Sequence, residues 1–377
     1  MAKMTDYKLT ATAAFGLESV VARELKWLGI EKVSVDNGRI AFSGSEDDIA
    51  RANINLRCAD RVLIEMGRFP ASDFEELFQG ARAISWEDLI PFGSIIKVLG
   101  RSVRSKLSSV PALQSVAKKA IIESMKRKHL FDQFPEKGPV FSIEISLQKD
   151  IATIYLDTTG PGLNKRGYRT GTGEAALKET LAAGLVYLTR WKPGIALTDP
   201  FCGSGTIPIE AAMVGRDIAP GINRRFVSED WPLISPDIWQ KSRQDARDKV
   251  RNPEMSITAS DMDGSMIVKA RRNARHAGVQ QSIHFMTRDV RDVSLGPEKG
   301  FIICNPPYGE RSGDKKAAAE LVTVMNQTFS RFPTWTCYIF TGFEDFERYY
   351  GRRADSNRKL YNGKIKCYLY GFVAQNR

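Results

Sequence analysis

The sequence predicts an α/β protein in which a mostly parallel, doubly wound sheet follows two smaller α+β units. Two observations predict this fold class. Beyond residue 190, short apolar runs alternate with amphipathic helical patterns, which is typical of parallel strands joined by crossover helices. Before residue 160, the strand patterns are interrupted by hairpin turns, which favours antiparallel pairing. With 377 residues, the chain is long enough for two or three domains.

The composition favours a cytoplasmic protein with a polyanionic partner. There are 55 Lys and Arg against 44 Asp and Glu, a formal net charge of +11, which favours nucleic acid as that partner. The five cysteines have no Cys-x-x-Cys spacing and the three histidines have no metal-ligand spacing, so we expect reduced thiols and no metal site. The sequence shows no signal peptide and no membrane-spanning apolar run. We therefore expect neither a membrane nor an obligate protein partner.

Residues 1–67 are predicted to form a ferredoxin-like domain. Their patterns occur in the order β-α-β-β-α-β, and a turn at Asn37-Gly38 separates the two central strands. This domain has no residue pattern typical of catalysis, so a binding or positioning role is favoured. The expected strands cover 7–13, 32–36, 39–43 and 61–67, and the expected helices cover 15–28 and 46–56.

Residues 68–159 contain the most concentrated positive charge of the chain. Between residues 101 and 130 there are eight Lys or Arg and one acidic residue, Glu123. Such a segment gains affinity for phosphates by releasing condensed counterions, although a solvated helix face is the alternative interpretation. Helices are expected at 74–81 and 111–130, and strands at 94–100, 140–148 and 151–157. The candidate RNA-binding side chains are Arg104, Lys106, Lys118, Lys119, Lys126, Arg127 and Lys128.

The same region resembles a THUMP domain, a small RNA-binding module found in RNA-modifying enzymes. The resemblance rests on Arg104-Ser-Lys106, Gln114, the run from Lys118 to Ile121 and the closing strand pair. It implies that this domain captures structured RNA.

A segment rich in Gly, Thr, Pro and Arg, residues 158–173, is predicted to link these domains to a third domain at 160–377. It contains three basic side chains around an aromatic residue, Lys165, Arg166 and Arg169 around Tyr168. We expect these three side chains to contact RNA, and a linker that contacts nothing is the alternative.

The third domain repeats a strand-then-helix rhythm, which implies a doubly wound sheet with a ligand crevice at the carboxyl ends of its strands. Asn362-Gly363 indicates a closing hairpin between 359–361 and 365–373. Residues 218–254 interrupt the rhythm and are expected to form either a lip over the site or a surface excursion. Strands are expected at 195–199, 256–261, 283–287, 301–305 and 336–341, and helices at 174–191, 265–277 and 317–331.

The stretch from Leu197 to Ala212 predicts a cofactor-binding turn, because its two glycines let the backbone approach a ligand in front of a helix N-terminus. Acidic residues end the next two strands. Asp261 suits a ribose diol, with Asp263 as the alternate, and Asp289 could accept from an adenine amino group. Asp261 lies far beyond the ribose acid of a dinucleotide fingerprint, which disfavours NAD. The candidate cofactor-binding residues are Asp199, Pro200, Phe201, Gly203, Gly205, Asp261, Asp263 and Asp289.

Asn305-Pro306-Pro307-Tyr308 indicates the class of reaction. The exocyclic amino group of a base is a poor nucleophile because its lone pair is delocalised into the ring. Oxygen acceptors from the Asn305 side chain and the Pro306 carbonyl can bind both amino hydrogens and aim the nitrogen lone pair at a methyl donor. Tyr308 can stack on an extruded base, and the two prolines restrict the backbone. The alternative is a Pro-Pro turn after a buried strand.

Four segments together resemble the THUMP-containing bacterial family of large-subunit rRNA guanine-N2 methyltransferases. The segments are Asp199 to Thr206, Asn305 to Arg311, Leu163 to Arg169 and Leu177 to Leu181. The resemblance implies a Rossmann-like class I methyltransferase domain, with a seven-stranded sheet and an antiparallel edge hairpin. It implies S-adenosylmethionine as the cofactor and the N2 amino group of a guanine in large-subunit (23S) rRNA as the methyl acceptor. It also implies that Lys165, Arg166 and Arg169 lie near the mouth of the active site.

Three other functions remain open from the sequence. Asn-Pro-Pro-Tyr is shared with N6-adenine methyltransferases acting on DNA or RNA, and relatives are often labelled as such. Methylation of a protein glutamine also uses this motif, but the basic N-terminal half makes it a poor fit. A catalytically silent RNA-binding factor for ribosome assembly is the third, and the intact loops disfavour it.

Overall fold

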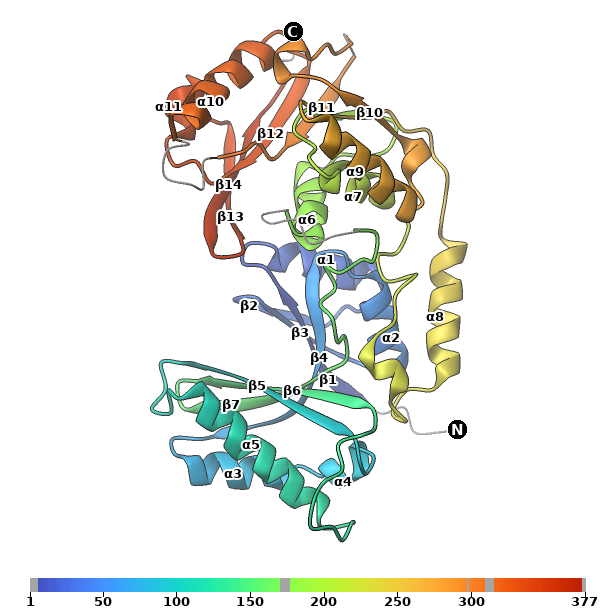
Figure 1. Cartoon of the computed structure of the whole chain (residues 1–377), viewed down its shortest axis with the longest axis vertical. Helices are drawn as coiled ribbons and strands as arrows, with labels where there is room; N and C mark the ends of the chain where they lie inside the picture. The colour runs from blue at the N-terminus through green and yellow to red at the C-terminus, as the bar shows by residue number, and fades with distance from the viewer. Residues whose placement is uncertain (1–5, 170–176, 297, 309–314, 375–377) are drawn as a thin grey trace.

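The computed structural model describes residues 6–169, 177–296, 298–308 and 315–374 of the chain. Two seven-stranded sheets organise it, one in the N-terminal part and one in the C-terminal part (Figure 1). Helices pack on the faces of both sheets, and residues 218–254 of the second part run back along the first part (Figure 1).

The first sheet begins with the predicted β-α-β-β-α-β unit. β1 lies between β3 and β4 and pairs antiparallel with both. The first helix buries Val20, Val21 and Leu25, whose spacing places them on one face. The ferredoxin-like arrangement is therefore confirmed. Its elements are β1 (Tyr7–Ala13), α1 (Glu18–Trp27), β2 (Val33–Asp36), β3 (Arg39–Gly44), α2 (Glu46–Asn55) and β4 (Ala59–Pro70).

The same sheet continues into the next unit. Its elements are α3 (Phe74–Ala83), α4 (Trp86–Leu89), β5 (Ile95–Val103), α5 (Val110–Met125), β6 (Val140–Gln148) and β7 (Ile151–Asp157). β4 pairs with β1 on one side and with β7 on the other, so the strand order is β2-β3-β1-β4-β7-β6-β5. Residue 67, where we expected one domain to end, lies inside β4, a strand that both units share.

The helix expected to reach Leu130 ends earlier, at Met125. The backbone N–H groups of Lys126, Arg127 and Lys128 bond to carbonyl groups only three residues back, which tightens the chain into turns. Met125 is the last fully buried apolar residue of this helix, so no burial favours its continuation beyond that point.

The second sheet has the strand order β10-β9-β8-β11-β12-β14-β13, with five parallel strands and an antiparallel pair at one edge. The predicted doubly wound sheet with its edge hairpin is confirmed. Its strands are β8 (Ala196–Asp199), β9 (Ile257–Asp261), β10 (Ile283–Thr287), β11 (Gly300–Cys304), β12 (Trp335–Thr341), β13 (Ser356–Asn362) and β14 (Ile365–Phe372). Its helices include α6 (Glu179–Thr189), α7 (Thr206–Gly215), α9 (Gly264–His276), α10 (Lys315–Phe329) and α11 (Phe346–Tyr350).

The segment 218–254 packs against the N-terminal units, so neither a lip over the site nor a surface excursion describes it. Its helix α8 (Pro236–Asp248) packs on α2, as Figure 1 shows. The Trp231 ring stacks on Phe141 of β6 with 4.6 Å between ring centroids, and Trp231 Nε1 donates to the carbonyl of Val140 over 3.0 Å. We call this segment, residues 218–254, the interdomain strut. Its aromatic side chain Trp231 contacts the N-terminal part.

The cysteines are buried thiols, as expected for a reduced protein, and none of the five forms a disulfide. Among the described residues, no three His, Cys, Asp or Glu side chains are grouped so that they could hold a metal ion. None of the helices in the described ranges is long and apolar enough to span a bilayer.

Candidate active site at the carboxyl edge of the parallel sheet

The loops that carry the predicted site residues leave four neighbouring parallel strands at their carboxyl ends. β10, β9, β8 and β11 are consecutive in the sheet, and Asp261 at the end of β9 lies directly beside Thr287 at the end of β10. From β8 the chain moves to β9 and β10 on one side and later to β11 and β12 on the other. Ligands of doubly wound sheets bind at such a switch point. The four loops therefore surround one candidate active site.

The loop between β8 and α7 is held by its neighbours on both sides. The backbone N–H of Cys202 donates to the carbonyl of Ser260 on β9 over 2.9 Å. The side-chain amide of Asn273 on α9 donates to the carbonyl of Ser204 over 3.0 Å. These two bonds fix the loop before any ligand arrives, and sequence spacing alone did not indicate Asn273.

Two positions in this loop require glycine for different structural reasons. Gly203 and Gly205 have φ angles of +51° and +87°, a region that favours glycine. A Cβ at Gly205 would lie 3.1 Å from the Cβ of Ala270, so this glycine lets α7 and α9 pack closely. A Cβ at Gly203 would meet no heavy atom nearer than Met266 Cε at 3.7 Å, so this side of the loop backbone is open. Gly203 is thus the position at which a ligand can approach the main chain.

Asp261 ties β9 to the glycine loop. Its Oδ2 accepts the backbone N–H of Gly203 over 2.9 Å and its Oδ1 accepts that of Asp263 over 3.0 Å. A carboxylate offers about four acceptor sites, so each oxygen keeps capacity for a ligand hydroxyl. Asp263 is exposed and caps α9 by accepting the N–H of Ser265. The geometry therefore favours Asp261 over Asp263 as a ligand for a ribose diol.

The other two predicted acids differ in access. Asp199 is 1% exposed and accepts the backbone N–H of Phe201 over 3.1 Å, and burial raises the pKa of its carboxyl well above the usual value. Asp199 therefore holds the turn by a hydrogen bond from its buried position. Its burial does not support the predicted direct contact with a cofactor. The Asp289 side chain is 26% exposed, accepts the N–H of Arg291 and pairs with its guanidinium over 3.0 Å. Asp289 therefore stays within reach of a ligand at the edge of the site.

Asn305 directly follows β11, and its side-chain orientation is set by the neighbouring strand. Its Nδ2 donates to the carbonyl of Phe340 on β12 over 2.9 Å. Oδ1, the acceptor, is the other arm of the same planar amide, so this bond leaves it pointing away from the Phe340 carbonyl. The next residue, Pro306, is buried, and Pro307 is exposed. The loop thus has an oriented side-chain acceptor at the position predicted for the reacting amino group.

Tyr308 is positioned from two sides by residues that sequence reasoning missed. Its hydroxyl accepts a hydrogen bond from Asn362 Nδ2 over 3.2 Å. Its ring lies against Gly342, where an added Cβ would come within 3.1 Å of the ring. The sequence indicates Asn362 only as a turn residue, and its contact with Tyr308 follows from the fold of the edge hairpin. Of the motif that begins at Asn305, residues 309–311 lie outside the described residues.

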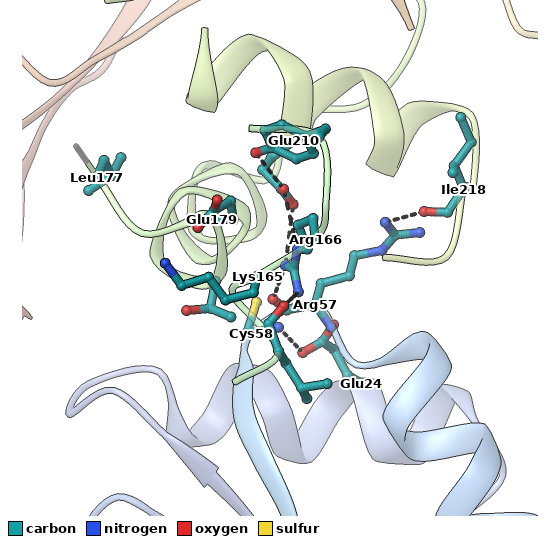
Figure 2. Close-up of polar contacts among 12 residues, drawn as sticks. Glu24, Arg57, Cys58, Lys165, Arg166, Leu177, Glu179, Glu210 and Ile218 are labelled. Atoms are coloured by element: carbon teal, nitrogen blue, oxygen red, sulfur yellow. Dashed lines mark hydrogen bonds and ion pairs between the residues drawn. The ribbon is translucent and has the colours of Figure 1, made fainter. Parts of the chain in front are cut away.

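The basic linker residues divide between surface and interior. Lys165 is exposed, as expected for an RNA contact. The Arg166 side chain is 1% exposed and lies 3.4 Å from the buried carboxylate of Glu210 on α7, as Figure 2 shows. The prediction that Arg166 contacts RNA is therefore wrong, because a basic residue in a linker can also be the partner of a buried acid. Arg169 donates to Thr206 Oγ1 over 2.6 Å and pairs with Glu179, so it positions the start of α7.

The candidate RNA-binding residues of the N-terminal part also differ in their surroundings. Four of them pair with acids: Lys118 with Glu136, Lys126 with Glu123, Arg127 with Glu87 and Lys128 with Asp88. Three of these acids lie outside the segment 101–130 and were not counted in its charge. Arg104 and Lys106 are exposed, and within the described residues neither forms a side-chain ion pair. Lys119 is exposed and lies 6.0 Å from the ring of Phe78.

S-adenosylmethionine, the cofactor that the resemblance implies, fits the residues present. Gly203 offers an open backbone and Asp261 keeps acceptor sites for two ribose hydroxyls. Met262 is 75% exposed beside Asp261, although it is a large apolar side chain, and it can pack on a purine ring. Gly203, Asp261, Met262 and Asp289 would therefore hold the cofactor. Met262 was not predicted from the sequence.

The chain resembles known proteins along nearly its whole length. Residues 166–371 match a family described as the RMKL-like methyltransferase domain. Residues 8–63 match the RlmL ferredoxin-like domain and residues 71–157 match the THUMP domain. The chain is 47% identical to a Bacillus subtilis (strain 168) protein named "Putative RNA methyltransferase YpsC", over 99% of this chain and 98% of that protein.

Solved structures share the whole architecture. The crystal structure of SMU.472, complexed with S-adenosylhomocysteine (SAH), is 44% identical with a TM-score of 0.93, and the match covers 100% of both chains. A Listeria monocytogenes structure, described as a "predicted N6-adenine-specific DNA methylase", is 43% identical with a TM-score of 0.93, over 98% of this chain and 97% of that one. The chain therefore belongs to the RMKL-like methyltransferase family, with a ferredoxin-like domain and a THUMP domain preceding the methyltransferase domain.

Proposed function

We propose that this S-adenosylmethionine-dependent RNA methyltransferase modifies the exocyclic N2 amino group of a guanine in large-subunit (23S) rRNA. The observation that carries the proposal is the oriented amide of Asn305, held by the carbonyl of Phe340 at the carboxyl edge of the sheet. An acceptor at this place suits an amino group, because it binds the N–H hydrogens and not the lone pair that must react.

The chain's residues contribute positioning and not strong base catalysis. When bound, the cofactor supplies a methyl group on a positively charged sulfur. Asn305 Oδ1 and the Pro306 carbonyl accept the two amino hydrogens, which localises the lone pair on nitrogen and directs it away from the loop. Tyr308, fixed by Asn362 and Gly342, presents a ring on which the base can stack. The acceptors then hold the developing ammonium proton until it passes to water.

RNA as the substrate is supported by the THUMP domain and by the name of the Bacillus subtilis relative. The choice of guanine N2 over adenine N6 rests on the family resemblance of the sequence motifs. Adenine N6 remains the second candidate, because an adenine amino group presents the same two hydrogens and the description of the Listeria monocytogenes structure names that base.

Product analysis tests the proposal directly. RNA from a strain lacking this protein is incubated with the purified chain and labelled S-adenosylmethionine, and its nucleosides are separated by mass spectrometry. We expect N2-methylguanosine in large-subunit rRNA. N6-methyladenosine as the labelled product would contradict the guanine proposal, and label in DNA alone would contradict the RNA proposal.

The Asn305→Ala variant tests the proposed catalytic loop in the same assay. We expect kcat to fall about 10²–10³-fold, because the variant lacks an acceptor aimed at the reacting amino group. SAH binding, measured by calorimetry, should be unchanged, since the cofactor residues lie on other loops. Loss of SAH binding in this variant would indicate a structural role for Asn305. Failure of the unmodified chain to bind SAH would instead favour the silent assembly factor.

A further inference from the structure

A cavity of about 380 Å³ lies where three parts of the chain meet. The ferredoxin-like domain contributes Phe15 and Asp60, the start of α6 contributes Lys178, and the β13–β14 hairpin contributes Tyr361 and Gly363. In Figure 1 the tip of this hairpin reaches the N-terminal domain near α1. No residue assigned to the active site lines this cavity.

The walls of the cavity are fixed by polar contacts between the domains. Arg358 on β13 donates from Nε and Nη2 to the carbonyl of Gly16, over 3.1 and 2.7 Å. Gly16 has a φ of +94°, and a Cβ there would lie 2.7 Å from the carbonyl of Lys359, so only glycine lets these segments approach so closely. On the other wall, Thr180 donates to Asp60 Oδ1 over 3.0 Å. The cavity is therefore preformed.

The cavity is adjacent to the proposed base-binding loop. Tyr361 and Gly363 line it, and the residue between them, Asn362, donates its side-chain hydrogen bond to Tyr308. Successive side chains of a strand point to opposite faces, so one segment of the hairpin serves both places. A polynucleotide with one base at Tyr308 can place the next base in the cavity by passing the hairpin turn at Gly363, which lines the cavity.

The lining has the chemistry of a nucleotide site. Phe15 is 47% exposed although it is a large aromatic side chain, and its ring meets Tyr361 edge to face with 5.6 Å between centroids. Aromatic faces stack on bases of any sequence, and an exposed ammonium group such as that of Lys178 suits a phosphate. Asp60 adds a carboxylate acceptor for a base N–H or a ribose hydroxyl. The volume is at the scale of a small-ligand site.

We propose that this cavity binds one nucleotide of the RNA next to the nucleotide that is methylated. Its base packs against Phe15 and Tyr361, and Lys178 contacts the adjoining phosphate. This inference rests on the proposed function, since it requires RNA as the substrate. It gives the ferredoxin-like domain a direct part in substrate recognition.

Two matched pairs of variants test the proposal with RNA from a deletion strain. Phe15→Ala removes the stacking ring, and Trp27→Ala removes an aromatic side chain of the same domain that is 60% exposed outside the cavity. Lys178→Glu reverses the charge in the cavity, and Lys241→Glu does so on the exposed surface of α8. We expect the KM for RNA to rise about tenfold for Phe15→Ala and Lys178→Glu, with the controls and SAH binding unchanged.

Cross-linking locates the nucleotide. A photoreactive phenylalanine analogue at position 361 is irradiated with the RNA, and primer extension maps the cross-link. We expect it within one or two nucleotides of the methylated position. Unchanged KM in both cavity variants, or a cross-link elsewhere in the RNA, would overturn the cavity proposal while RNA methylation by the unmodified chain persists. If the unmodified chain neither methylates nor binds RNA, the proposed function fails, and this inference fails with it.

Discussion

Asp261 and Asp263 are chemically identical side chains two residues apart, and their surroundings give them different roles. Asp261 ends β9 and accepts N–H groups from two loops, one of them the glycine loop. Asp263 is exposed and caps α9. A cap requires one acceptor oxygen, which asparagine supplies as well as aspartate does. A diol requires acceptors on both oxygens of the group, which only the carboxylate supplies.

This difference predicts opposite outcomes for one conservative change. Asp261→Asn replaces one acceptor oxygen by a donor, and we expect SAH to bind at least about tenfold more weakly because a hydrogen bond to a charged group is lost. Asp263→Asn keeps the cap, so SAH binding should stay within about twofold. Isothermal calorimetry with both variants checks the assignment. Weaker binding in Asp263→Asn alone would move the ribose contact to Asp263.

At the scale of elements, a buried polar network joins the linker to α7 and to the ferredoxin-like domain (Figure 2). Arg166 pairs with Glu210 of α7 and also donates to the carbonyl of Leu163 over 2.8 Å. Tyr168 donates its hydroxyl to Glu210 over 3.0 Å. Burial by itself lowers the pKa of Arg166, but Glu210, Tyr168 and Glu179 together outweigh burial and raise it, so the guanidinium stays charged. On the other side, Glu24 accepts the backbone N–H groups of residues 57 and 58.

Removing one partner of this buried pair should destabilise the fold. We expect Arg166→Met to lower the free energy of unfolding by about 3–5 kcal/mol, because Glu210 would remain buried without its cation. The double variant with Glu210→Gln should recover much of this loss. Urea denaturation measures both, and Lys165→Met, at an exposed position, is the control with an expected change within about 0.5 kcal/mol. Equal costs at positions 165 and 166 would contradict the buried pair.

At the scale of the whole molecule, the three domains are fastened to one another by several separate contacts. The first two share β4. The strut 218–254 joins the methyltransferase domain to both, since α8 packs on α2 and Trp231 stacks on Phe141. Arg57 adds a hydrogen bond to the carbonyl of Ile218 over 2.7 Å. The THUMP domain is thus held in one position relative to the candidate active site.

Trp231→Ala tests this coupling. We expect a loss of about 3–5 kcal/mol in the free energy of unfolding, since a large buried ring is removed. RNA methylation should show a raised KM while SAH affinity is retained, because the strut contacts the THUMP domain and not the cofactor loop. Trp231→Phe keeps a ring for stacking and loses the indole hydrogen bond, so its effect should be smaller. An unchanged KM in Trp231→Ala would show that the strut only stabilises the fold.

The sequence predicted most strands within a few residues, and the strands that precede the two candidate site loops end within one residue of their predicted ends. The strand at 283–287 was predicted with its observed bounds, and those ending at Asp261 and Asp199 began one residue late in the structure. Strands and helices can be predicted in this way because the periodic spacing of apolar residues within one element is visible in a short stretch of sequence. The prediction failed where a residue's partner is distant. Arg166 and Glu210 are 44 positions apart. The sequence around Arg166 therefore does not indicate that its partner is a buried acid on a later helix.

The sequence by itself determined the class of protein and indicated the two loops proposed for its chemistry, because glycines at positive φ and paired prolines restrict the backbone at their own positions. Only the tertiary structure decided which basic side chains are exposed and which are interior, what the strut covers, and that Phe15 and Tyr361 share a cavity. The physical reason is that burial and pairing depend on contacts between residues distant along the chain, and the order of side chains in the sequence does not contain them.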